Sequence, residues 1–101
     1  ASAISDIEYD AANEAVVISF DGDVPSKIKS FMLSENPRYV IDFYGISKVK
    51  VPNRKQFDGD IVRLVRYGAH ANKVRIVVEV NRADIRVKKS ANGSDYTVKF
   101  Q

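Results

Sequence analysis

The sequence of 101 residues contains no cysteine and no tryptophan, and it has only one histidine, His70. Without cysteine, structural disulfides and thiolate metal sites are excluded. No apolar run approaches the roughly 20 residues that span a bilayer, so we expect no direct membrane insertion. The hydrophobic fraction of 45% is too high for a disordered chain. Length and composition therefore predict a single folded domain over residues 1–101.

Catalytic signatures are equally scarce. A hydrolase triad needs a histidine beside a nucleophilic serine and an acid, and no serine stands in a nucleophile-elbow context. There is no glycine-rich phosphate loop and no metal-ligand spacing. Two Phe-Asp-Gly-Asp segments, 20–23 and 57–60, lack the ligand spacing of a calcium loop and are interpreted as turns. The sequence thus predicts no catalytic residue, no metal and no cofactor.

Charge is unevenly distributed along the chain, although the net charge is only +3. Residues 1–50 carry 5 basic and 8 acidic side chains, whereas residues 51–101 carry 11 basic and 5 acidic ones. A basic second half suits an anionic partner such as nucleic acid, lipid headgroups or an acidic polymer. An ordinary solvated surface is the alternative interpretation.

An apolar and aromatic pattern occurs twice, at an offset of 58 positions that becomes 57 near the end. The recurring segments are 7–11 with 65–69, 16–20 with 74–78, and 39–43 with 96–100. Apolar positions repeat while the polar positions between them drift, as expected when folding constrains one face of each strand. We therefore interpret the chain as an internal duplication with half-repeats at about 4–45 and 61–101.

Apolar residues mostly alternate with polar ones, which predicts β-strands. The expected strands are residues 4–9, 16–20, 25–33, 39–43, 47–51, 61–67, 74–80, 85–88 and 96–100. Residues 52–60 are expected to form a loop, with a helical turn as the alternative, and Asn92-Gly93 predicts a hairpin through a type I′ turn. Short strands at regular spacing without a long helix predict an all-β fold, a compact β-sandwich of two similar, pseudo-symmetric sheets.

Aromatic residues stand among basic ones in the second half, so nucleic-acid binding has to be considered. Tyr96 and Phe100 share a strand face with Val98, and they repeat Tyr39 and Phe43. Aromatic residues in register with core valines are typical of a core rather than of a base-stacking surface. The basic residues alone would bind nucleic acid without sequence preference. We therefore expect no nucleic-acid partner.

Two strand-like motifs carry a family resemblance. Residues 36–45 read Asn-Pro-Arg-Tyr-Val-Ile-Asp-Phe-Tyr-Gly, and residues 72–80 read Asn-Lys-Val-Arg-Ile-Val-Val-Glu-Val, after Val-Arg-Tyr-Gly at 65–68. In this order they resemble the AMIN domain, the N-terminal module of periplasmic N-acetylmuramoyl-L-alanine amidases that also occurs in type IV pilus secretins. The resemblance covers nearly the whole chain.

The resemblance implies a sandwich of two symmetric sheets and a non-catalytic module of the periplasm and cell envelope. In amidases such domains carry the enzyme to the division site and bind peptidoglycan, and in secretins they anchor the assembly to the cell wall. We therefore expect this chain to bind peptidoglycan and to target or anchor its host protein. Envelope proteins of the division or pilus machinery are further expected partners.

Two other functions compete with cell-wall binding as interpretations of the sequence. The alternative is a protein-interaction module in a secretin or amidase assembly, with an edge near residues 48–51 or 86–89 pairing with a partner strand. A nucleic-acid binder is less favoured, since no recognised binding motif accompanies the basic residues.

The candidate binding residues break the repeat at solvent-facing positions. Arg66 and Arg75 stand where the first copy has Glu8 and Val17. Peptidoglycan offers carboxylates from its stem peptides and lactyl groups, and arginine binds carboxylates through paired hydrogen bonds. A surface ion pair of little energetic weight is the alternative role for each arginine. The predicted peptidoglycan-binding residues are Arg38, Arg63, Arg66, Tyr67, His70, Lys73 and Arg75.

Two further features of this surface are expected from the same alternation. Tyr44 and Tyr67 are the candidates for a ring that faces a sugar. Asp42 alternates with Arg38 away from the apolar face of residues 39–43. A structural role at the strand edge is the alternative for both residues, and for Asp42 it is the favoured interpretation.

Overall fold

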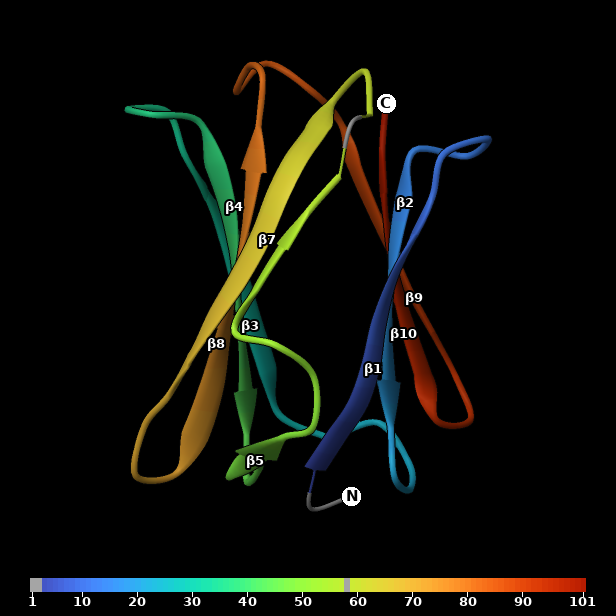
Figure 1. The fold of residues 1–101 in the computed structure, drawn as a ribbon, viewed down its shortest axis with the longest axis vertical. Helices are drawn as coiled ribbons and strands as arrows, with labels where there is room; N and C mark the ends of the chain where they lie inside the picture. Colours follow the sequence, from blue (N-terminus) through green and yellow to red (C-terminus); the bar gives the residue numbers. More distant parts are fainter. Residues whose placement is uncertain (1–2, 58) are drawn as a thin grey trace.

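The structure, a computed structural model, describes residues 3–57 and 59–101 and consists of two β-sheets packed face to face (Figure 1). The described residues form ten strands and no helix. The strands are β1 (Ala3–Asp10), β2 (Ala15–Phe20), β3 (Ile28–Leu33), β4 (Arg38–Tyr44), β5 (Lys48–Val49), β6 (Arg54–Gln56), β7 (Val62–Ala69), β8 (Lys73–Val80), β9 (Val87–Asn92) and β10 (Asp95–Phe100). Sheet A has the order β5-β1-β2-β10-β9, and sheet B has the order β3-β4-β8-β7-β6. The predicted all-β sandwich of two similar sheets is confirmed.

Each sheet takes one hairpin from each half of the chain. In sheet A the β1–β2 hairpin joins the β9–β10 hairpin, and in sheet B the β3–β4 hairpin joins the β7–β8 hairpin. In strand order, β1, β2, β10 and β9 therefore correspond to β7, β8, β4 and β3. This arrangement suits two duplicated halves that exchange hairpins, while the half-repeats themselves stay a prediction.

A β-bulge marks the same place in both sheets. The pairing of β1 with β2 shifts at Ser5, and the pairing of β7 with β8 shifts at Arg63, 58 positions later. A bulge leaves one residue unpaired and changes the direction of its side chain. The bulge in β7 thereby sets Arg63 apart from the regular alternation of that strand.

The offset of 58 does not hold for the second strand of each hairpin. Tyr9 pairs with Val16, whereas Tyr67 pairs with Ile76, so the counterpart of Val16 is Ile76, 60 positions away. The predicted equivalence of residues 16–20 with 74–78 is therefore wrong by two residues. Because a strand returns to the same face every two residues, this slip leaves the apolar alternation unchanged and the pattern cannot reveal it.

Aromatic side chains from both sheets meet at the centre of the core. Phe43 and Phe100 have exposed fractions of 0% and 1%. The ring of Tyr39 meets Phe100 edge-on with centroids 5.9 Å apart, and Tyr96 meets Phe43 at 5.4 Å. Each contact joins one sheet to the other, and such pairs contribute about 0.5–1.5 kcal/mol beyond their burial. The expectation that Tyr96 and Phe100 belong to the core is confirmed.

The segment expected to be a loop or helical turn, residues 52–60, contains the strand β6. This strand pairs antiparallel with β7, and Lys55 crosses to sheet A, where its Nζ donates to the carbonyl oxygen of Ile7 at 2.7 Å. The chain then approaches Tyr9 so closely that a Cβ on Gly59 would lie 2.0 Å from the Tyr9 hydroxyl oxygen. Residues 54–57 and Gly59 therefore cover one open side of the sandwich. Residue 58 lies outside the described residues.

The β9–β10 hairpin confirms the predicted turn but not its type. Asn92 pairs with Asp95, so the two turn residues are Gly93 and Ser94. Only Gly93 of these residues has a positive φ, 62°. One positive φ at the first central position is typical of a type II′ turn, so the type I′ prediction is wrong. The strand expected at 85–88 accordingly lies later, at Val87–Asn92.

Candidate functional site

The outward-facing side chains of β3, β4, β6, β7 and β8, here called face B, form an apolar strip flanked by cations. Across neighbouring strands Arg66 pairs with Val77, Val77 with Val40, and Val40 with Phe31. Phe31, 40% exposed, is the one exposed large hydrophobic side chain of the described residues. Val40, between Val77 and Phe31 in this row, is only 2% exposed although it points outward. Face B is therefore more than a plain solvated surface.

A buried carboxylate lies near one end of face B. Asp42 is 3% exposed, and Arg75 donates to its two oxygens from Nε at 2.9 Å and from Nη2 at 3.0 Å. Lys73 Nζ lies 3.4 Å from the same carboxylate. The hydrogen bonds from Arg75 hold the pKa of Asp42 below its ordinary value, against the opposing effect of burial. The Nε and Nη2 donors of Arg75 are thus already engaged within the protein.

Tyr44 adds an aromatic ring to the same end of face B. Lys27 Nζ lies 4.5 Å from the ring centroid, and Lys73 Nζ lies 5.4 Å from it. These distances are typical of cation–π contacts. The ring expected to face a sugar therefore already has two ammonium groups close to it.

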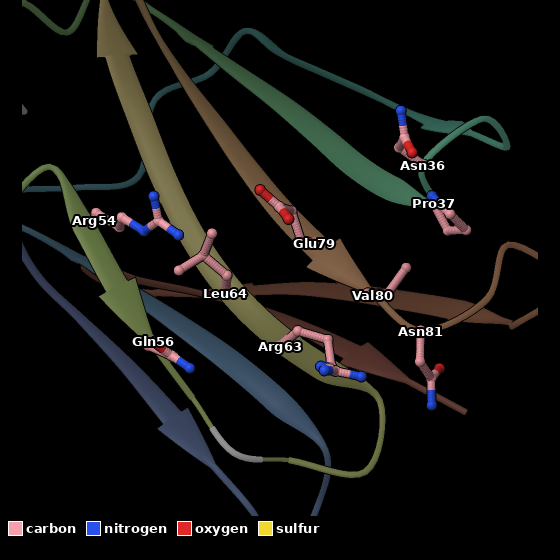
Figure 2. A pocket seen from close by; sticks show the side chains of 9 residues that line it. All are labelled: Asn36, Pro37, Arg54, Gln56, Arg63, Leu64, Glu79, Val80 and Asn81. Carbon is pink, nitrogen blue, oxygen red and sulfur yellow. The ribbon is translucent and has the colours of Figure 1, made fainter.

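A hollow of about 520 Å³ lies where β6, β7 and β8 approach the β3–β4 turn (Figure 2). Its polar side chains are Asn36, Arg54, Gln56, Arg63, Glu79 and Asn81. Its apolar side chains are Pro37, Leu64 and Val80. Figure 2 shows Leu64 between the side chains of Arg54 and Arg63. The hollow thus combines two guanidinium groups, amides and an apolar surface.

A second hollow of about 380 Å³ shares Asn36 and Glu79 with the first and is also lined by Arg38 and Arg66. Arg66 Nε lies 3.1 Å from a carboxylate oxygen of Glu79. Arg38 Nη1 donates to the carbonyl oxygen of Glu35 at 2.6 Å and so holds the β3–β4 turn. Both arginines of this second hollow therefore already have partners.

Arg54 and Arg63 differ from these arginines in having no ion pair among the described residues. Both are exposed, and across residues 3–57 and 59–101 neither has a carboxylate within ion-pair distance. Arg54 pairs across the strands with Arg66, and Arg63 stands at the bulge of β7. Their guanidinium groups are available to an external anion.

Most of the predicted site residues gather on face B. Arg38, Arg66, Lys73 and Arg75 occupy its strands, and Arg63 lines the first hollow. With the corrected offset, the first-copy counterpart of Arg75 is Ala15 rather than Val17.

Two predicted site residues lie elsewhere. Tyr67 pairs with the buried Ile76 on the inward side of β7, and its hydroxyl donates to the carbonyl oxygen of Val51 at 2.5 Å. Its ring therefore does not belong to face B. His70 is exposed in the β7–β8 turn, about 20 Å along the strand from Arg63.

The sequence did not single out Arg54, Gln56, Asn36 or Asn81 as site residues. Arg54 contributed to the basic excess of the second half, but the direction of its side chain depends on a strand that the pattern does not indicate. The asparagines belong to turns, where their type is ordinary. Only the fold brings these side chains to one hollow.

Neither a metal-binding cluster nor a membrane-spanning helix occurs among the described residues. Within the described ranges, no three histidine, aspartate or glutamate side chains are grouped closely enough to hold a metal ion. The same part of the chain has no helix of the length and hydropathy needed to cross a bilayer. The predicted turn at 57–60 is described only in part, because Asp58 lies outside these ranges.

The family model of the AMIN domain matches residues 6–100, nearly the whole chain. The chain belongs to the AMIN domain family. AMIN domains are non-catalytic modules that bind peptidoglycan and target amidases and secretins, and they occur in periplasmic proteins. A search of the curated proteins finds no match to this chain.

The edge strands of this AMIN domain are the sites at which the alternative function, a protein-interaction module, would pair with a strand of a partner. β5 has only two residues and pairs in parallel with β1. β9 exposes every side chain from Lys88 to Asn92. Lysines on an edge strand oppose pairing with another chain, because the pairing would bring their charges close together. Neither edge offers as strong a candidate site as face B.

Proposed function

We propose that this AMIN domain binds peptidoglycan through face B and so anchors or targets its host protein in the cell envelope. The observation that best supports this proposal is the difference in charge between the outward faces of the two sheets. Five arginines lie on or beside face B, namely Arg38, Arg54, Arg63, Arg66 and Arg75. The outward-facing side chains of β1, β2, β9 and β10, here called face A, include the carboxylates Asp6, Glu8 and Asp10 along β1.

Peptidoglycan is an acidic polymer, and its carboxylates match the guanidinium groups of face B. Charge-assisted hydrogen bonds between arginine and carboxylate are about twice as strong as neutral ones. Arg54, Arg63 and Arg66 are exposed enough to make such contacts. Arg75 supports the face differently, because it neutralises the buried Asp42.

Co-sedimentation of the domain with purified peptidoglycan sacculi tests this function. The variant Arg54→Glu/Arg66→Glu reverses two charges beside the hollows without touching Asp42. The matched control Arg86→Glu/Lys88→Glu makes the same charge change at the exposed edge of sheet A. We expect saturable wild-type binding that weakens with salt, is lost in the first variant and is retained in the control.

Two outcomes would contradict the proposal. If the Arg54→Glu/Arg66→Glu variant pellets with sacculi as the wild type does, face B is not the binding surface. If the wild type does not bind sacculi even at low salt, the domain does not bind the wall directly, and a protein partner becomes the better explanation.

A further inference from the structure

We infer that the first hollow of face B binds the stem peptides of peptidoglycan through their carboxylates, with Arg54 and Arg63 as the main contacts. This inference rests on the proposed function and deepens it, because it names the part of the polymer that is bound. The glycan strand would then lie outside the hollow and contribute little to affinity.

The guanidinium groups of Arg54 and Arg63 indicate that the ligand is an anion. Both are exposed, both lack an internal carboxylate partner among the described residues, and Leu64 lies between them (Figure 2). A guanidinium group presents five donors in a planar fork that matches a carboxylate. Two such groups on either side of one apolar side chain suit a short ligand with more than one carboxylate.

The remaining lining indicates a peptide rather than a polyanion. Asn36, Gln56 and Asn81 offer amide donors and acceptors that match peptide groups. The carboxylate of Glu79, which pairs with Arg66, has further acceptor capacity for the N–H groups of a peptide, and its charge opposes a dense array of phosphates. Leu64 and Val80 give the hollow an apolar surface for the small side chains of a peptide.

The same lining argues against the glycan strand as the ligand. Rings that stack on sugars are aromatic, and no aromatic side chain lines the hollow. In intact peptidoglycan the lactyl carboxyl group is bonded to the stem peptide as an amide, so the free carboxylates belong to the peptides. A volume of about 520 Å³ falls within the roughly 300–1,000 Å³ of small-ligand sites and suits a short peptide.

Three ligand preparations separate this inference from the proposed function. The first is intact sacculi, and the second is glycan strands from which an amidase has removed the stem peptides, leaving free lactyl carboxylates. The third is the soluble stem tetrapeptide, together with a version whose carboxylates are converted to carboxamides. Binding is measured by co-sedimentation for the polymers and by titration calorimetry for the peptides.

We expect the wild type to bind intact sacculi and the tetrapeptide, and to bind stripped strands and the carboxamide peptide at least about tenfold more weakly. Arg54→Gln/Arg63→Gln should weaken tetrapeptide binding about 10- to 100-fold, since it removes two charge-assisted contacts. The control Arg86→Gln/Lys88→Gln, with the same loss of charge, should bind as the wild type does.

The outcomes distinguish the two proposals. Equal binding to intact and stripped polymer, or binding to stripped strands alone, overturns the inference while the proposed function stands. Equal binding of the tetrapeptide and its carboxamide version also overturns it. Wild type that fails to bind intact sacculi and tetrapeptide overturns both. Thermal melting of each variant checks that lost binding does not reflect lost folding.

Discussion

The two sheets of this domain share their inward faces but differ in their outward ones. Rows of paired residues correspond between them, and the row Arg66, Val77, Val40, Phe31 on face B matches Glu8, Val17, Thr97, Ser90 on face A. An acidic residue and two hydroxyl groups thus stand where face B has an arginine, a buried valine and an exposed phenylalanine. One scaffold therefore presents an ordinary polar surface on one side and a candidate binding surface on the other.

A second row of paired residues also differs between the two outward faces, and here the difference affects how the sheet is stabilised. Asp42 and Arg75 of face B correspond to Lys99 and Ala15 of face A. Only face B therefore has a buried ion pair at this position. On face B the side chain of Arg75 is therefore held by Asp42, whereas Arg54 and Arg63 have no ion pair among the described residues.

The largest expected effect tests whether the inward faces of the two sheets are equivalent. Phe43→Ala and Phe100→Ala each remove a fully buried ring at corresponding positions of the two sheets. We expect each to lower the free energy of unfolding by about 3–5 kcal/mol, because each leaves a cavity in the core. Urea denaturation measures both. If one of the two changes has little effect, the two inward faces are not equivalent.

Removing the partner of Asp42 tests the structural part of face B. Arg75→Ala leaves a 3% exposed carboxylate with only Lys73 nearby, at 3.4 Å. We expect a loss of about 1.5–3 kcal/mol of unfolding free energy, the usual range for hydrogen bonds to charged groups. The comparison variant Lys99→Ala changes the position that corresponds to Asp42 and should stay within about 0.5 kcal/mol. Equal effects would show that Asp42 and Arg75 do not stabilise the sheet.

Protonation of Asp42 should contribute to the loss of unfolding free energy at acid pH. Its folded-state pKa lies below the ordinary value, so between the folded and unfolded pKa values the folded protein binds fewer protons. The resulting stability is fully present above the unfolded pKa of about 3.9 and is lost as pH falls through the folded pKa. Urea unfolding from about pH 6 to about pH 2 should show a shallower acid decline for Asp42→Asn than for wild type. Parallel curves would assign the decline to other carboxylates.

The smallest expected effect concerns the arginines proposed to bind. Arg54→Gln/Arg63→Gln removes two exposed side chains that have no ion pair within the part of the chain that the structure describes, so the unfolding free energy should change by less than about 0.5 kcal/mol. For a domain of this size that corresponds to a shift in the thermal midpoint of less than about 4 °C. Calorimetry is the measurement. A larger loss would show that these arginines are structural and would weaken their assignment to binding.

The fold was predictable where side chains alternate strongly. Tyr39, Ile41 and Phe43 repeat as Tyr96, Val98 and Phe100, and this pattern indicated both the core and the two similar sheets. β6 was missed because Arg-Lys-Gln shows no apolar alternation, and its strand exists through backbone pairing with β7. The apolar pattern cannot reveal the two-residue slip between β2 and β8, because a shift of two residues leaves the alternation of apolar and polar side chains unchanged.

The candidate site was predictable only in part. Arg66 is predictable because it breaks the repeat at a solvent-facing position, and Arg38 because it alternates away from the apolar face of residues 39–43. Tyr67 was assigned to the surface from its sequence context, but strand pairing turns it inward beside Ile76. Arg54 comes near Arg63 only through the pairing of β6 with β7, which local sequence does not determine. Pairing between segments distant in sequence therefore decides which residues share a hollow.

The most direct test of face B as the binding surface is a ¹⁵N chemical-shift titration of the domain with soluble peptidoglycan fragments. We expect the largest shifts on β6, the start of β7, the end of β8 and the β3–β4 turn, and no change on face A. Shifts concentrated on β1, β9 and β10 would contradict it and would place binding on the other sheet.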